Sequence, residues 1–140
     1  MTSIKLEDLD AVNRSQISEM SKAGRTLHPG RSDSVIQFAK LVKNMEAAIR
    51  HTYQLTAHAA IREPDPSKAA NLWQEMEELC KSALSEIKAL KEVYPQSGTP
   101  DLYNLTLDYL LAAQQRRAQN VEDVECLKTP VPKGLFQAKS

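Results

Sequence analysis

The fold is decided by residues 69–94, which read AANLWQEMEELCKSALSEIKALKEVY. Apolar side chains recur there every three or four positions, at Ala69, Trp73, Met76, Cys80, Ala83, Ile87, Leu90 and Tyr94. Because an α-helix completes a turn in about 3.6 residues, this spacing places those side chains on one face. The stretch therefore predicts a long amphipathic helix.

Proline residues set both ends of this helix. Asp65 precedes Pro66, and in such a pair the aspartate caps free backbone N–H groups while proline occupies the first helical position. Pro95 follows the last apolar position, Tyr94, and stops the helix. We expect the helix to begin at Pro66 and to end before Pro95.

A second amphipathic segment precedes this one. From Ser32 or Asp33, either of which can cap a helix, apolar residues alternate by three and four as far as Ala59. Pro64 ends the segment near Arg62, because the residue before a proline disfavours the helical conformation.

A third helix follows the turn at residues 95–98. Thr99-Pro100-Asp101 repeats the capping signature, and apolar positions continue to Leu127. Its first half is apolar around most of its circumference, through Leu102, Tyr103, Leu105, Leu107, Tyr109, Leu110 and Leu111. A three-helix bundle buries only one broad face of each helix, so these residues are our candidates for binding a partner. The alternative is that an N-terminal helix covers them.

Three long helices joined by short loops run antiparallel, so we expect an all-α, up-down bundle over residues 32–127. In residues 1–31, the apolar residues between Leu6 and Met20 predict a fourth amphipathic helix, and the alternative is a mobile arm. The residues from Ala23 to Arg31 have the composition of a linker. Residues 128–140 are expected to be an extended, flexible tail, because Pro130 and Pro132 bar a helix.

Composition narrows the function classes. The chain has 140 residues, which suits one domain, and 18 basic residues balance 18 acidic ones. This neutrality disfavours nucleic acid as a partner, and no stretch approaches the roughly 20 apolar residues of a membrane span. Charged residues near the N-terminus stand where a signal peptide needs an apolar run, and the two cysteines have no close partner. We expect a cytoplasmic protein that binds neither nucleic acid nor membrane.

Motifs for catalysis and cofactor binding are missing. No GxSxG elbow, Cys-His arrangement or phosphate-binding glycine loop is present. His51 and His58 are about 10 Å apart along a helix, which is too far for one metal ion. Cys80 belongs to the apolar stripe and is expected to pack in the core. We therefore nominate no catalytic residue, no metal site and no cofactor.

One acidic pattern supports an alternative. Glu75 and Glu78 form an ExxE pair, and an antiparallel hairpin brings Glu122 and Glu125 to the same level. Acidic pairs on adjacent helices are similar to those of helical nucleotide pyrophosphohydrolases, although the second pair of that family typically reads ExxD. The resemblance implies a magnesium-dependent hydrolase.

The interpretation that we favour is a non-enzymatic interaction module: an adaptor, a small chaperone, or a regulatory or immunity-type subunit. Its partner is another protein or a second copy of the chain, so that a homo-oligomer is an open alternative. The partner helix would bind the apolar face of the third helix, with Leu135 and Phe136 of the tail as further contacts.

Overall fold

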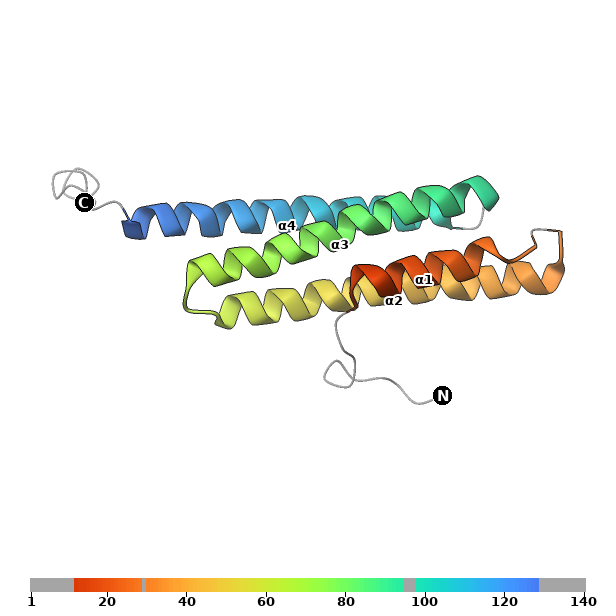
Figure 1. The fold of residues 1–140 in the computed structure, drawn as a ribbon, viewed down its shortest axis with the longest axis horizontal. Helices are drawn as coiled ribbons and strands as arrows, with labels where there is room; N and C mark the ends of the chain where they lie inside the picture. Colours follow the sequence, from red (N-terminus) through yellow and green to blue (C-terminus); the bar gives the residue numbers. More distant parts are fainter. Residues whose placement is uncertain (1–11, 29, 95–97, 129–140) are drawn as a thin grey trace.

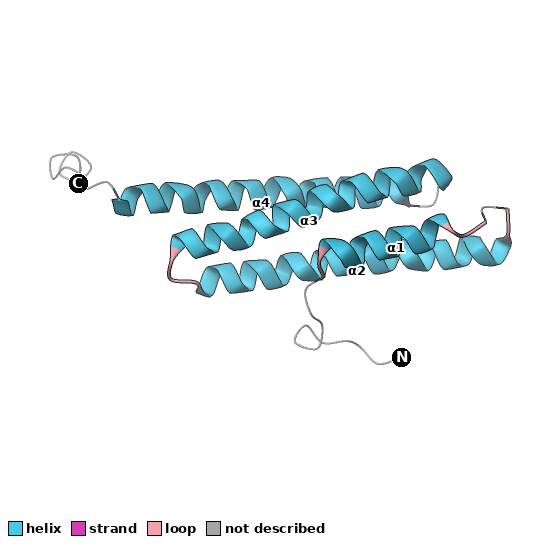
Figure 2. Cartoon of the chain, viewed as in Figure 1, coloured by secondary structure: helices cyan, strands magenta, loops and turns pink. Residues whose placement is uncertain are grey.

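The structure is a computed structural model that describes residues 12–28, 30–94 and 98–128. These residues form α1 (Arg14–Arg25), α2 (Ser32–Arg62), α3 (Pro66–Val93) and α4 (Thr99–Lys128), and the described chain contains no strand (Figures 1 and 2). The prediction of an all-α bundle with three long helices is confirmed, and α1 is a fourth, shorter helix. Lys128, the first residue of the predicted tail, belongs to α4, and residues 129–140 of that tail lie outside the described part.

The helix ends follow local chemistry. The Asp65 side chain accepts a hydrogen bond of 2.9 Å from the backbone N–H of Ser67, and Pro66 occupies the first position of α3. At the other end, the backbone N–H of Tyr94 donates to the carbonyl of Leu90. The predicted start of α3 and its end before Pro95 are confirmed.

We expect Asp65→Ala to lower the free energy of unfolding by about 1 kcal/mol, the usual value of an N-cap. The substitution removes the acceptor for Ser67 while leaving Pro66 in place. Urea denaturation monitored by circular dichroism measures the change. Asp65→Asn keeps a side-chain oxygen at the cap and serves as the control, and an equal loss in both variants would show that the cap bond contributes nothing.

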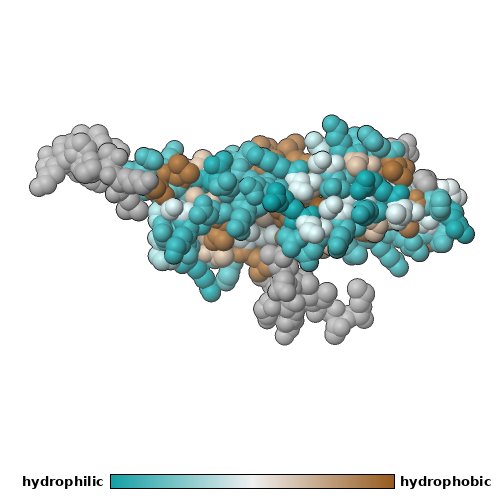
Figure 3. All heavy atoms as spheres, in the orientation of Figure 1, coloured by the Kyte–Doolittle hydropathy of each residue, from teal (hydrophilic) through white to brown (hydrophobic). Residues whose placement is uncertain are grey.

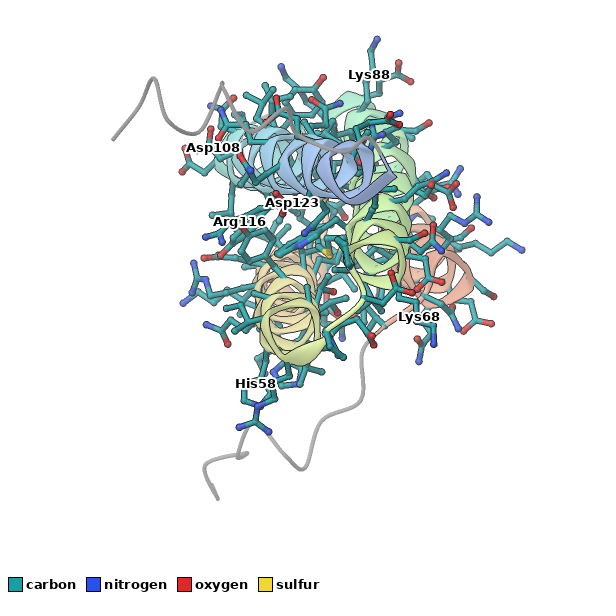
Figure 4. All side chains as sticks on the ribbon, turned by 90° about the vertical axis from the view of Figure 1, so that its left-hand side faces the viewer. His58, Lys68, Lys88, Asp108, Arg116 and Asp123 are labelled. Atoms are coloured by element: carbon teal, nitrogen blue, oxygen red, sulfur yellow. The ribbon has the colours of Figure 1, made fainter. Side chains whose placement is uncertain are left out.

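Helix α3 is the centre of the bundle. It packs against α1, α2 and α4, whereas α2 and α4 meet each other more sparsely. Viewed along the bundle, α2, α3 and α4 form a triangle, and α1 lies outside it, on the side of α3 that faces away from α4 (Figure 4). The eight stripe residues from Ala69 to Tyr94 are all buried, so the predicted inward face of α3 is confirmed.

Cys80 lies in this core with no exposed surface. Burial raises the pKa of its thiol to about 12, and the neighbouring charge of Glu77 acts in the same direction. Because only the thiolate attacks disulfide reagents, the native thiol is nearly inert at neutral pH. The expectation that Cys80 packs in the core is confirmed.

We predict that, in a Cys126→Ser background, Cys80 reacts with Ellman's reagent at pH 8 more than 100-fold more slowly in the native protein than in urea, given its raised pKa and burial. The absorbance of the released thiolate follows the reaction. Native and unfolded rates within a factor of about ten would mean that the thiol is reached without unfolding.

Helix α1 corrects the predicted linker. Residues 23–31 were expected to be a linker because of Gly24, Pro29 and Gly30, yet α1 continues to Arg25. Gly24 is buried, and a Cβ placed on it would lie 2.5 Å from Leu41 Cδ2 and 2.8 Å from Leu90 Cδ2. The glycine is therefore there for close helix packing, not for a turn. The true connection is short, from Thr26 to Arg31.

Candidate interaction surface on α4

The seven predicted interaction residues of α4 divide between the core and two partly open sides. Leu102 and Leu110 are core residues, exposed by only 2% and 7%. The others retain accessible surface: Tyr103, Leu105, Leu107 and Tyr109 are half-buried, and Leu111 is 49% exposed. Leu135 and Phe136 lie outside the described residues.

The side of α4 that faces α2 holds a hollow of about 400 Å³. Leu102 and Leu105 of α4 and Val42 of α2 supply apolar lining. Charged groups from both helices, including Lys43 and Asp101, also line it. The hollow exists because α2 and α4 both pack mainly against α3, which leaves the seam between them incompletely filled.

Farther along the same seam, aromatic rings close the gap. The ring centroids of Tyr53 and Tyr109 are 4.7 Å apart, and those of Tyr53 and Trp73 are 5.4 Å apart. The Arg116 guanidinium lies 5.9 Å from the Trp73 ring centroid, on the open side between α4 and α2 (Figure 4). Tyr109 also raises the pKa of Arg50, chiefly through a side-chain hydrogen bond. This half of the seam is therefore filled by the protein itself.

The other side of α4 points away from α2 and carries a discontinuous apolar strip. Leu107, Leu111, Ala118 and Val121 follow one another at roughly helical spacing. Leu111 and Val121 are 49% and 42% exposed. We call these four residues the outer strip. On the face seen in Figure 3, apolar residues form separate areas among polar ones.

Helix α1 packs on α3 and α2 instead of along α4. The alternative that an N-terminal helix covers the surplus apolar residues of α4 is therefore wrong for the described chain. Ser21 and Gly24 explain the choice, because these small, buried residues let α1 approach α3 closely. The Ser21 hydroxyl also donates to the backbone carbonyl of Glu86 at 3.4 Å.

An ion pair that the sequence analysis missed links α3 to α4. Arg117 donates from Nε and Nη2 to both carboxylate oxygens of Glu77, with Nη2 and Oε1 3.3 Å apart. Glu77 is 3% exposed, and its hydrogen bond and charge raise the pKa of Arg117. The sequence did contain one signal for the burial of Glu77. This residue follows Trp73 by four positions, so it borders the apolar stripe of α3.

The structure does not assemble the carboxylates needed for magnesium. Glu75 and Glu78 border a hollow beside α1, whereas Glu122 and Glu125 are exposed residues of α4. Among the side chains that the structure describes, no three His, Cys, Asp or Glu groups are placed so as to hold a metal ion. His51 is 8% exposed and His58 is exposed.

Comparison with protein families, curated proteins and solved structures gives no match for this chain. Among the described helices, none combines the length and the apolar character that a membrane span requires. The geometry of α4 is therefore the starting point for a function.

Proposed function

We propose that this protein is a non-enzymatic interaction module that binds a helix of another protein, or of a second copy, through α4. The outer strip of α4 is the observation that carries the proposal. Leu111 and Val121 remain about half exposed although α1, the element available to cover them, packs elsewhere. Burying such side chains contributes about 25 cal/mol per Å² of apolar surface, which favours association.

The arrangement suits an adaptor, a small chaperone, or a regulatory or immunity-type subunit. Leu107 and Leu111 sit on a rigid helix that α3 holds along its length, so a partner helix would meet a preformed ridge. Coiled-coil-like packing against this ridge needs no movement of the bundle. A cytoplasmic location accords with Cys80, a free and buried thiol.

We expect a double substitution, Leu111→Glu with Val121→Glu, to abolish the association while the bundle stays folded. Light scattering over a concentration series measures the mass of the full-length chain and of the variant. If the native chain forms a dimer, the variant should be monomeric. If the native chain is a monomer, its specific partners, captured by pull-down, should be lost with the variant.

Exposed apolar residues of α2 provide the matched control. Ile36 and Ile61 are 59% and 75% exposed, so Ile36→Glu with Ile61→Glu makes the same chemical change away from α4. This control should keep the mass and the partners of the native chain. Equal behaviour of the two double variants would remove α4 from the proposal. No observation favours the hydrolase, because its four carboxylates are not grouped in the described chain.

A further inference from the structure

The outer strip of α4 lies between two edges of opposite charge. Lys88 follows Glu77 on α3 by eleven residues, or three helical turns, so it lies on the side of α3 that meets α4. Asp108 comes directly after Leu107, on the other side of the strip. Viewed along the bundle, Lys88 stands at the α3 edge of this face, and Asp108 lies on the side of α4 that is away from α3 (Figure 4). The face therefore has a positive edge, an apolar centre and a negative edge.

The two charged groups lie at nearly the same level of the bundle. Helices α3 and α4 run antiparallel, and the ion pair of Glu77 with Arg117 fixes their register. Eleven residues along α3 from this pair lead to Lys88, and eleven residues back along α4 lead to Thr106. Asp108 is two residues from there, about 3 Å along the helix axis. Lys88 and Asp108 are exposed, and neither belongs to any of the ion pairs formed among the described residues.

This charge pattern is complementary to itself in one orientation. A two-fold axis parallel to the helices turns the positive edge of one copy toward the negative edge of the other and keeps each residue at its own level. A two-fold axis across the helices would instead place like edges opposite each other, and like charges repel across an interface. The chain has 18 basic and 18 acidic residues, so net charge does not keep two copies apart.

We propose that the occupant of the outer strip is a second copy of this chain, in a parallel two-fold dimer. The inference rests on the proposed function and names its partner. Leu111 and Val121, about half exposed in one chain, pack on the same residues of the second copy. Lys88 of each copy forms an ion pair with Asp108 of the partner subunit.

The length of the outer strip sets the strength of this dimer. The strip extends from Leu107 to Val121, about 21 Å along α4. Glu125, the next residue on the same line, would face its own copy, so the contact ends at Val121. An interface of this length is smaller than that of a permanent dimer. We therefore expect a dissociation constant in the micromolar range, which light scattering up to about 1 mM measures.

Single cysteines on the strip test the orientation. Leu111→Cys and Val121→Cys are made separately in the Cys126→Ser background, and gel electrophoresis without reductant follows disulfide-linked dimers during oxidation. A parallel dimer brings each residue against itself, so both variants should link about tenfold faster than Ile36→Cys, an exposed position of α2. An antiparallel dimer cannot do this for two positions ten residues apart. Linking of only one variant, or faster linking between the two variants than within each, would overturn the proposal.

Charge reversal tests the edges. Lys88→Glu gives each copy two negative edges, so the dissociation constant of the dimer should rise about tenfold at low salt. Lys88→Glu with Asp108→Lys exchanges the edges and should restore the native constant. Lys68→Glu makes the same change at an exposed position of α3 that lies away from α4, and it should have no effect (Figure 4). An exchange that fails to restore the dimer, or an equal rise for Lys68→Glu, would contradict the proposal.

The mass of the native chain separates this proposal from the proposed function. A native chain that stays monomeric at about 1 mM overturns the parallel dimer. The proposed function falls only if Leu111→Glu with Val121→Glu changes neither the mass nor the captured partners. If a monomeric native chain became a dimer with Leu135→Asp and Phe136→Asp, the occupant of the strip would be the chain's own tail and not a second copy.

Discussion

Arg117→Ala is expected to lower the free energy of unfolding by about 2–3 kcal/mol, the cost of stranding a buried carboxylate. Glu77 is 3% exposed, and Arg117 supplies donors to both of its oxygens. In the alanine variant, the Glu77 carboxylate stays in the α3–α4 interface, and water that enters beside it is its only remaining source of hydrogen-bond donors. Urea denaturation should show an earlier midpoint with an unchanged slope.

Arg116→Ala is the matched control for this prediction. Arg116 is the neighbouring residue, and its guanidinium lies over the Trp73 ring without pairing with a buried acid. Its loss should cost less than about 1 kcal/mol. The double variant Glu77→Leu with Arg117→Met should recover most of the stability, because it removes the charge together with its partner. Equal losses for the two arginines would mean that Glu77 needs no specific partner.

The sequence predicted the long helices well because their determinants are local. The stripe from Ala69 to Tyr94 has one spacing throughout, and Asp65-Pro66 marks its start within two residues. Each signal depends on the helical repeat or on a backbone donor close in the chain. Neither signal depends on how the neighbouring helices pack, so the helix and its start are the same in the structure as in the prediction.

The arrangement of α4 could not be predicted in the same way. Its apolar residues lie on nearly every side, so periodicity does not decide which of them α3 buries. The structure buries Leu102 and Leu110 and leaves Leu111 exposed, and packing against α3 makes that choice. The sequence therefore predicted the candidate surface only as a set of residues. The tertiary structure was needed to tell which of them belong to the core and which to the outer strip.

The position of α1 was also beyond local reasoning. Gly24 and Ser21 have weak apolar character, and glycine in a sequence more often marks a turn than a helix contact. The role of Gly24 appears only beside Leu41 and Leu90, where the absence of a side chain permits close approach, and Ser21 lies against the backbone carbonyl of Glu86. The same two residues direct α1 onto α3 and so leave the outer strip of α4 uncovered.

Gly24→Leu is expected to destabilise the docking of α1 by about 3 kcal/mol, the upper range for overpacking a well-filled interface. Even the first added atom would lie 2.5 Å from Leu41 Cδ2 and 2.8 Å from Leu90 Cδ2, and Leu90 is completely buried. Leucine favours helix more than glycine does by under 1 kcal/mol, so the clash dominates. Hydrogen exchange should show lost protection in residues 14–25, while the centre of α3 remains protected.

Ala23→Leu tests whether the effect comes from packing or from added bulk. Ala23 is the preceding residue of α1 and is exposed, so leucine there meets solvent and should leave exchange in α1 unchanged. If Gly24→Leu also left α1 protected, both Leu41 and Leu90 would have moved aside, and the close approach at Gly24 would not be what holds α1. Loss of protection in Gly24→Leu but not in Ala23→Leu would show that the docking of α1 on α2 and α3 depends on the missing side chain at Gly24.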